Sequence, residues 1–347
     1  MEISWKDVYQ KILEEAEALQ ASDIHLAADQ PVFYRVQGRL RPDFAQLLSG
    51  SMLEEAIDMM LSKAAYAAYQ REGSWDFSWC MGKQRFRVNA YCQRGHPALA
   101  LRRIPCRIPR LAELGAPQAV QELLQTRNGL ILVSGRMGAG KTTTLAAFLD
   151  ELNHQRPVHI VTLEDPLEYL LMPVCAFISQ RELGKDFSSF ASGLRSALRQ
   201  DPDVLLIGEL RDAETVRIAL QAAETGILVL SSLHTKSAAE TAMRLEGMFS
   251  AEEQLQVRTQ LAIVLRAVIS QQLLPAREQG RVCAAEVLLA TPAVRNLIRT
   301  GKPAQLNSAL LGGTRLGMQT MEQAVEKLYR MGRISAETAA AYRIEDG

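Results

Sequence analysis

The sequence has few cysteines and no long uncharged apolar run. Its cysteines are scattered, and no two form a C-x-x-C pair: Cys80, Cys92, Cys106, Cys175 and Cys283. This spacing argues against a zinc ribbon or a disulfide framework and is typical of a protein in a reducing cytosol. No uncharged apolar stretch approaches the ~18 residues that a membrane-spanning helix requires. Any membrane contact is therefore expected to be peripheral or through a partner.

A surplus of charge is absent as well. The 347 residues include 39 lysines and arginines and 39 aspartates and glutamates, so the formal net charge is zero. Proteins that bind nucleic acids usually carry a basic surplus, and we therefore expect no nucleic-acid partner. The first residues, Met1–Asp7, do not resemble a signal peptide, which fits a cytoplasmic location.

Residues 1–107 carry the pattern of a small α+β domain. Apolar residues recur at helical spacing from Trp5 to Leu19, and segment 31–40 has the pattern of a hairpin that turns at Gly38. The segments that follow are predicted as helices at 52–60 and 64–69 and as antiparallel strands at 75–79, 85–91 and 98–102. Because Pro105, Pro109 and Pro117 then interrupt regular structure, we place the domain boundary between residues 107 and 108.

Residues 108–347 have a different pattern. Four apolar runs rich in β-branched residues alternate with helical segments: 130–133, 158–163, 204–207 and 227–230. Runs that are apolar on both faces indicate a buried, predominantly parallel sheet, hence an α/β fold that binds ligands beyond the carboxyl ends of its strands. Further along, the sequence predicts a helix from a capping box at 250–253, strands at 268–274 and 282–289, and C-terminal helices at approximately 292–347.

A glycine-rich phosphate-binding loop follows the first of these runs. The residues predicted to surround the phosphates are Gly135, Arg136, Met137, Gly138, Ala139, Gly140, Lys141, Thr142 and Thr143. Residues 135–142 match the motif G-x-x-x-x-G-K-[ST], with a strand before it and a helix after it. Glycine lets backbone N–H groups turn toward phosphate oxygens, Lys141 can reach the β- and γ-phosphates, and the Thr142 hydroxyl can ligate Mg²⁺. The sequence therefore predicts binding of a nucleoside triphosphate with Mg²⁺.

Acidic residues follow the second and third runs. Glu209 ends the Walker B-like stretch that begins at Asp201, and it can hold Mg²⁺ through water or polarise the attacking water. Glu164 and Asp165 are adjacent, so in an extended segment their side chains point to opposite sides. We expect Glu164 to face the nucleotide and to be, with Glu209, a candidate general base. The sequence leaves open which of the two activates water.

His234 and several arginines complete the predicted site. His234 lies at the end of the fourth run, where it can sense the γ-phosphate. Hydrolysis of this kind often needs a cation to neutralise developing charge, commonly an arginine from a neighbouring subunit. The candidates are Arg211 within the same subunit and, on strands of the first domain, Arg85, Arg87, Arg102 and Arg103.

In combination, these motifs resemble the type IV pilus retraction ATPases, the twitching-motility branch of the secretion-ATPase superfamily. Besides the phosphate loop, the similarity includes segments 22–26, 85–89, 102–105, 162–168, 194–203, 207–212, 223–226 and 233–235. Segment Thr291–Thr300 resembles the C-terminal signature A-I-R-N-L-I-R-E of the retraction subgroup, with Val294 in place of Ile and Thr300 in place of Glu. In the phosphate loop, Arg136 and Met137 stand where relatives usually have Pro-Thr.

The resemblance implies a PAS-like first domain and a RecA-like second domain, assembled as a homohexameric ring with ATP between subunits. It assigns Lys141 and Thr142 to phosphate and Mg²⁺, Glu164 and Glu209 to hydrolysis, and His234 to sensing. The arginines that would reach the nucleotide of the neighbouring subunit are Arg85, Arg87 and Arg102. The implied partners are an inner-membrane platform protein and the rest of the pilus machinery, at the cytoplasmic face of the inner membrane.

Three alternatives to a retraction motor stay open. The first is another motor of the same superfamily, which drives pilus assembly or type II secretion or is an accessory pilus ATPase. The four-cysteine metal site that assembly ATPases typically carry is not found in this sequence, which favours retraction. The second alternative is a RecA-like motor that depends on nucleic acid, and the third is a binding module that uses ATP only as a conformational switch.

Overall fold

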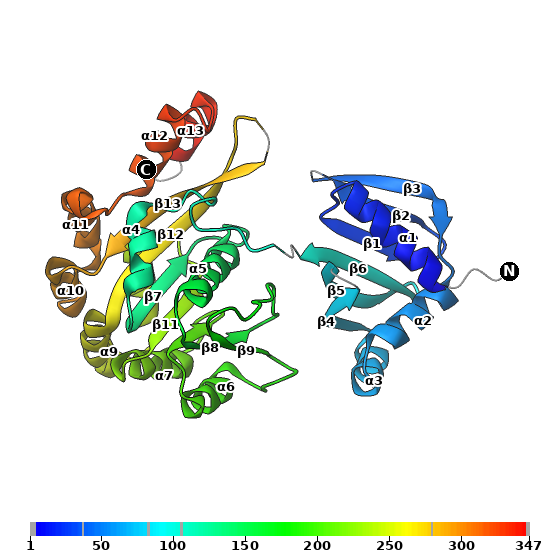
Figure 1. The fold of residues 1–347 in the computed structure, drawn as a ribbon, viewed down its shortest axis with the longest axis horizontal. Coiled ribbons are helices and arrows are strands. Elements are labelled where there is room, and N and C mark those ends of the chain that lie inside the picture. The colour runs from blue at the N-terminus through cyan, green and yellow to red at the C-terminus, as the bar shows by residue number, and fades with distance from the viewer. Residues whose placement is uncertain (1–4, 37, 82–83, 105–106, 279, 345–347) are drawn as a thin grey trace. The chain divides into compact units, whose positions relative to one another are not determined.

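The computed structural model describes residues 5–36, 38–81, 84–104, 107–278 and 280–344 (Figure 1). The chain divides into two compact units, Met1–Arg107 and Ile108–Gly347. Residues 1–4, Gln37, Pro105 and Cys106, to which the sequence analysis refers, lie outside the described residues.

The first unit is built on a six-stranded antiparallel sheet with the strand order β3-β2-β1-β6-β5-β4. Its elements are α1 (Trp5–Ala18), β1 (Asp23–Ala27), β2 (Pro31–Val36), β3 (Arg39–Leu47), α2 (Gly50–Met60), α3 (Lys63–Glu72), β4 (Ser74–Met81), β5 (Gln84–Gln93) and β6 (His96–Ile104). Alternate strand residues such as Ile24 and Leu26 point into one core with Ile12 of α1 and Ile57 of α2. The helices therefore cover one face of the sheet.

The second unit is an α/β domain. It contains α4 (Gln118–Glu122), β7 (Gly129–Ser134), α5 (Lys141–Gln155), β8 (His159–Glu164), β9 (Phe177–Glu182), α6 (Phe190–Ala197), β10 (Val204–Ile207), α7 (Ala213–Glu224), β11 (Leu228–Leu233), α8 (Ala238–Glu246), α9 (Ala251–Val264), β12 (Leu265–Pro275), β13 (Arg281–Leu289), α10 (Pro292–Arg299), α11 (Leu306–Gly312), α12 (Met321–Arg330) and α13 (Ala336–Ile344). Short 3-10 turns lie at 123–125, 198–200, 303–305 and 314–316.

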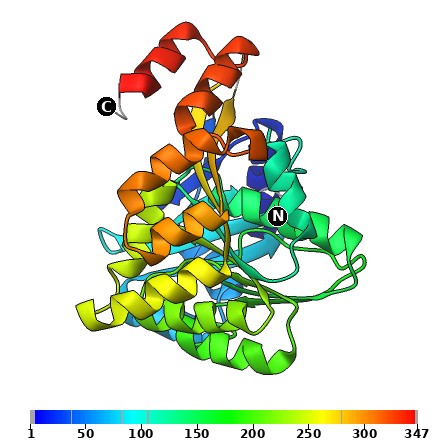
Figure 2. The ribbon, with the colours of Figure 1, turned by 90° about the vertical axis from the view of Figure 1, so that its left-hand side faces the viewer.

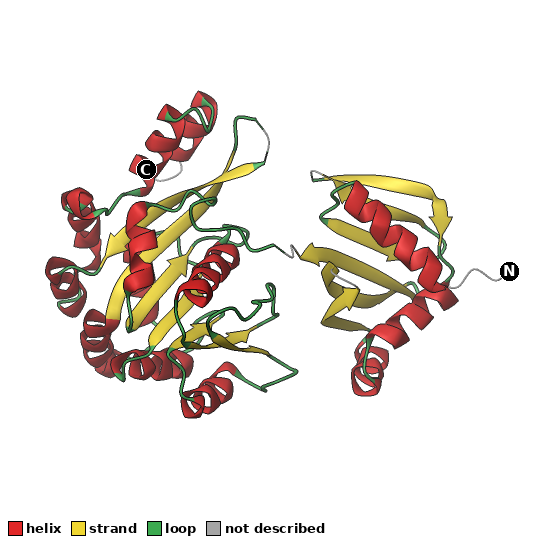
Figure 3. Ribbon diagram, viewed as in Figure 1, coloured by secondary structure: helices red, strands yellow, loops and turns green. Residues whose placement is uncertain are grey.

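The sheet of this unit has seven strands in the order β13-β12-β7-β11-β10-β8-β9, and β13 is antiparallel to its neighbour while the other pairs are parallel. Leu130 and Leu132 of β7 pack in one core with residues of α6 to α10, whereas Ile131 and Val133 pack in a second core with α4 and α5. Helices therefore lie on both faces of the strands (Figure 3). The predicted α/β class with a predominantly parallel sheet is confirmed.

The C-terminal part of this unit is built on the β12–β13 hairpin. After β13, helices α10 to α13 succeed one another, coloured orange to red in Figure 2. Leu274 of β12 and Val282 of β13 form a small separate core with Met321 and Val325 of α12. The far end of the hairpin is thus fixed by the last helices.

The structure contains a strand that the sequence analysis missed, namely β9. Strand β9 is at the edge of the sheet and carries polar residues in its sequence, Phe-Ile-Ser-Gln-Arg-Glu, so it lacks the apolar run used to identify the inner strands. Among the described residues, no helix has both the length and the apolar character needed to cross a membrane.

Gly129, at the start of β7, has no room for a side chain, and we therefore expect its substitution to destabilise the fold. Gly129 has φ +100°, and a Cβ there would lie 2.5 Å from the Val264 carbonyl oxygen, whereas Gly226 has φ +108° and open space around its Cβ position. Gly226→Ala should therefore cost only the strain of a positive φ in a residue with a Cβ, about 1–2 kcal/mol, and Gly129→Ala should add the cost of overpacking, about 1–3 kcal/mol more. Urea unfolding of the two variants should show this difference, and equal losses would contradict the steric argument.

Candidate nucleotide-binding site

The predicted phosphate loop joins β7 to α5 through a turn that requires glycine. A Cβ added to Gly135 would lie 2.5 Å from the carbonyl oxygen of Gln271, so a side chain does not fit there. Gly138 and Gly140 have φ values of +77° and +87°, a conformation that residues with a Cβ rarely adopt. Around Gly138 no atom lies within 4 Å of the added Cβ, so this side of the turn is open to a ligand.

The other loop residues are arranged around this backbone. Arg136 and Met137 are exposed, Met137 to 89%, and Ala139 is buried. Thr142 and Thr143 are half-buried in the first turn of α5. The side chains of Arg136 and Met137 point to solvent, so their replacement of the usual Pro-Thr leaves the glycine backbone in place.

Lys141 lies at the centre of the site and is buried. Its ammonium group donates to the carbonyl oxygens of Gly135 (2.8 Å) and Arg136 (3.2 Å) and lies 3.2 Å from Nδ1 of His234. Burial lowers the pKa of Lys141, and the negative charges of Glu209 and Glu168 oppose this shift only in part. The ammonium group of Lys141 is therefore already held against the loop in which a phosphate would bind.

Glu209 follows β10 and connects two other predicted residues. One carboxylate oxygen accepts a hydrogen bond from Nε of Arg211 at 2.8 Å, and the other lies 3.6 Å from Nε2 of His234. The hydrogen bond from Arg211 to Glu209 raises the pKa of this arginine, against a smaller effect of burial. Arg211 also lies 3.5 Å from the carboxylate of Asp165. Residues from the ends of β8, β10, β11 and the phosphate loop thus form one continuous polar chain.

A cavity of about 250 Å³ adjoins this chain. Its described lining includes Glu209, Arg211 and His234 together with Glu240 and Arg244 of α8. The backbone beneath it is fixed by hydroxyl groups of β11, because Ser231 and Ser232 donate to the carbonyl oxygens of Ile207 (2.7 Å) and Gly208 (2.6 Å). The strand ends that carry Glu209 and His234 are therefore held together directly.

Glu164 and Asp165 differ in exposure. Glu164 is buried, 6% exposed, and accepts a hydrogen bond from the Thr162 hydroxyl at 2.7 Å, whereas Asp165 is exposed. The two side chains thus lie on opposite sides, in line with the expectation for adjacent residues of an extended segment.

The arginines of the first unit have different surroundings. Arg102 is exposed and its Nε donates to Asp23 at 2.9 Å. Burial by itself raises the pKa of Asp23, but hydrogen bonds from Arg102 and Ser22 outweigh it, so this pKa lies below its usual value. Arg87 is directly opposite Arg102 in the β5–β6 register and is exposed, whereas Arg85 is buried, 8% exposed.

The structure adds residues around the site that the sequence analysis missed. Thr143 lies 3.0 Å from the hydroxyl of Tyr169, Gln271 donates to Thr144 at 2.9 Å, and Ser134 donates to Ser270 at 2.9 Å. These partners lie on β12 and on the loop after β8. Tyr169 directly follows the segment 162–168, in which only the carboxylates were considered, and the Ser270-Gln271 pair lies inside a strand that was noted only for its extended pattern.

Helix α10 contains the segment that resembles the retraction signature. Val294 and Ile298 are buried, and the Thr300 hydroxyl donates to the Asn296 carbonyl oxygen at 2.8 Å. Arg295 donates to carbonyl oxygens at the end of α9, including that of Leu265 at 2.8 Å. The segment therefore fastens α9 to the domain, and the threonine that replaces Glu ends its own helix.

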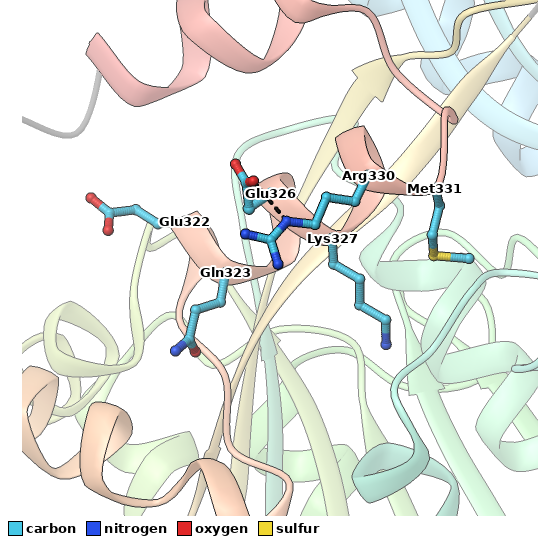
Figure 4. Close-up of a pocket in the computed structure, with 6 residues that line it drawn as sticks. All are labelled: Glu322, Gln323, Glu326, Lys327, Arg330 and Met331. Atoms are coloured by element: carbon cyan, nitrogen blue, oxygen red, sulfur yellow. Dashed lines mark hydrogen bonds and ion pairs between the residues drawn. The ribbon is translucent and has the colours of Figure 1, made fainter.

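A second hollow, of about 760 Å³, lies along α12 (Figure 4). Its described lining residues are spread along the length of that helix and end with the residue that caps it: Glu322, Gln323, Glu326, Lys327, Arg330 and Met331. Arg330 donates to Glu326 at 2.9 Å within this set. None of these residues is among the predicted site residues, so the hollow is separate from the phosphate loop.

The residues around the phosphate loop fit a triphosphate with a divalent cation. A cradle that a Cβ would fill at Gly135, an ammonium group at Lys141 and an open turn at Gly138 suit phosphate oxygens. The hydroxyl of Thr142 and the carboxylate of Glu209 are hard oxygen donors, the ligand type that Mg²⁺ prefers.

Comparisons with known proteins agree with this reading. A family model described as type II/IV secretion system protein matches residues 2–339. The chain is 46% identical to an uncharacterised protein of Escherichia coli, YggR, over 90% of this chain and 95% of that protein. It is 42% identical to the type IV pilus retractation ATPase PilT of Pseudomonas aeruginosa, over 92% of this chain and 93% of that protein.

Among solved structures, a crystal structure of the pilus retraction motor PilT with bound ADP superposes with a TM-score of 0.88. Its sequence is 44% identical to this chain, and the match covers 95% of both chains. The family match and the relatives both extend over nearly the whole length, including the phosphate loop and the strand ends described above. The chain therefore belongs to the type II/IV secretion system protein family.

Proposed function

We propose that this protein is a Mg²⁺-dependent ATPase that works as a homohexameric motor for type IV pilus retraction. The observation that carries the proposal is the polar chain Lys141–His234–Glu209–Arg211, which ends at the phosphate loop. The superposed PilT structure contains ADP, which supports an adenine nucleotide as the ligand. Its name as a pilus retraction motor supports the pilus as the structure on which the motor acts. We also propose that the motor contacts an inner-membrane platform protein at the cytoplasmic face of the inner membrane.

In this mechanism Lys141 and the backbone N–H groups of the loop bind the β- and γ-phosphates. Mg²⁺, held by Thr142 and Glu209, would neutralise charge on the phosphate oxygens. Glu164, buried and oriented by Thr162, and Glu209 are the two carboxylates that can accept a proton from water. The assignment of the base to one of the two stays open.

His234 is suited to sense the γ-phosphate because its ring lies between Lys141 and Glu209. Nδ1 lies 3.2 Å from the Lys141 ammonium group and Nε2 lies 3.6 Å from the Glu209 carboxylate. A phosphate that draws Lys141 toward itself would alter the contact of Lys141 with His234, whose ring also faces Glu209. Of the arginines proposed to act across a subunit boundary, Arg87 and Arg102 are exposed, whereas Arg85 is buried and would have to leave its surroundings first.

The proposed site predicts two different losses. Lys141→Ala should abolish both nucleotide binding and hydrolysis, because the buried cation that faces the phosphates is gone. Glu209→Gln should retain nucleotide binding but lower kcat by about 10²-fold or more, since a metal ligand or base is removed. Steady-state ATPase assays and binding of a fluorescent ADP analogue measure these effects. The exposed Lys302→Ala and Glu252→Gln are matched controls, and full activity of either site variant would refute the assignment.

The direction of work is tested in cells. Deletion of the gene in the source bacterium should leave an excess of surface pili, counted by electron microscopy, and abolish twitching motility. Complementation with the wild-type gene should restore both, and the Lys141→Ala gene should restore neither. A cell without pili would instead identify an assembly motor. ATPase activity stimulated several-fold by DNA, with steep salt dependence, would favour a nucleic-acid motor.

A further inference from the structure

The loop between β8 and β9 lies against the start of the phosphate-loop helix. Its Tyr169 is 8% exposed, and the hydroxyl lies 3.0 Å from the hydroxyl of Thr143. Burial raises the pKa of Tyr169, and its bond with Thr143 opposes this shift in part. Thr143 directly follows Thr142, the residue assigned to Mg²⁺. This loop therefore contacts the first turn of the helix that follows the phosphate loop.

Two amide side chains hold this loop: Asn153 of α5 bonds the backbone of Met172 and Val174, and Gln180 of β9 bonds the part around Tyr169. Nε2 of Gln180 donates to the carbonyl oxygen of Tyr169 at 2.9 Å, and its Oε1 accepts from the N–H of Leu171 at 2.8 Å. These two bonds use a donor and an acceptor of the loop on either side of residue 170, as a neighbouring strand would. Gln180 thus fixes the backbone that carries the Tyr169 ring.

The same amide also faces Glu164. Nε2 of Gln180 lies 3.4 Å from Oε1 of Glu164, the oxygen that accepts from Thr162. Thr162 and Gln180 are direct neighbours in the β8–β9 register, and Glu164 is two residues further along β8, so all three side chains share one face of the sheet. One residue therefore contacts a candidate general base and the loop that reaches the phosphate-loop helix.

We propose that Gln180 is a positioning residue for nucleotide hydrolysis, which orients Glu164 directly and Thr143 through Tyr169. The role in hydrolysis rests on the proposed ATPase function, whereas the contacts of Gln180 do not depend on it. Gln180 itself has both polar ends committed to the protein, so its role is to place other groups. Glu164 belongs to the chemical step and Thr143 to the bound nucleotide, so the two branches should affect different kinetic parameters.

Two variants separate the branches. Tyr169→Phe removes only the hydroxyl next to Thr143, and Gln180→Leu removes the amide with little change in volume. Ser179→Ala is the matched control, because Ser179 is adjacent on β9 and pairs instead with Nε2 of His159 at 3.0 Å. For each full-length variant, ATPase kcat and KM, the affinity for a fluorescent ADP analogue and the melting temperature are measured.

We expect Tyr169→Phe to weaken ADP binding about three- to tenfold, the loss of one hydrogen bond, with kcat within about twofold of wild type. Gln180→Leu should weaken ADP binding to a similar degree and in addition lower kcat at least about tenfold. Adding Tyr169→Phe to Gln180→Leu should weaken ADP binding little further, because the backbone at Tyr169 has already lost its bond to Gln180. Ser179→Ala should change neither parameter.

Wild-type kcat and ADP affinity in Gln180→Leu would overturn the proposal. So would a loss of kcat that disappears at a temperature far below the melting point, because it would reflect stability alone. If Gln180→Leu does not fold, Gln180→Glu replaces it. That variant keeps the acceptor for Leu171 but sets a second carboxylate beside Glu164, so kcat should fall, and an unchanged kcat refutes the role. Absence of turnover in the wild-type protein would refute the ATPase function, while the ADP measurements would still test the loop.

Discussion

The parallel arrangement of β7, β8, β10 and β11 is the constraint on which the site depends. Parallel strands end at the same edge of a sheet, so four segments far apart in the sequence must present their next residues side by side. Lys141, Glu209 and His234 meet for that reason, and the serine hydroxyls of β11 hold the end of β10 in register. Without this arrangement, Lys141, Glu209 and His234 would not lie within reach of one another.

Residues directly after apolar runs could be predicted from the sequence. The runs identified the inner strands, and the order of the chain then placed Glu209 and His234 at one edge. Gln180 and Tyr169 could not be found in this way, because β9 is a polar edge strand and its register with β8 depends on tertiary pairing. The burial of Arg85 was also beyond sequence reasoning, since the neighbouring Phe86 is buried as well and strict alternation fails there.

The site consists of two hydrogen-bonded sets that meet at the start of α5. One contains Lys141, His234, Glu209 and Arg211, and the other contains Thr162, Glu164, Gln180 and Tyr169. The first set is partly exposed and charged, whereas the second is largely buried and has one carboxylate. Buried, hydrogen-bonded polar groups resist displacement. We therefore expect the side chains of the second set to stay in place when a nucleotide binds, and those of the first set to change their contacts.

Strand β12 connects the phosphate loop with the last helices. Near Gly135, its Gln271 carbonyl closes the back of the glycine turn, and about 10 Å further along the strand Leu274 packs in the small core beneath α12. β12 pairs with β13 from Ala267 to Pro275 but, among the described residues, with β7 only as far as Ser270, so beyond the phosphate loop the strand is supported by the β12–β13 hairpin alone. The phosphate-loop end of β12 and the core beneath α12 are thus joined by one continuous hairpin, so a shift at either end reaches the other through paired backbone.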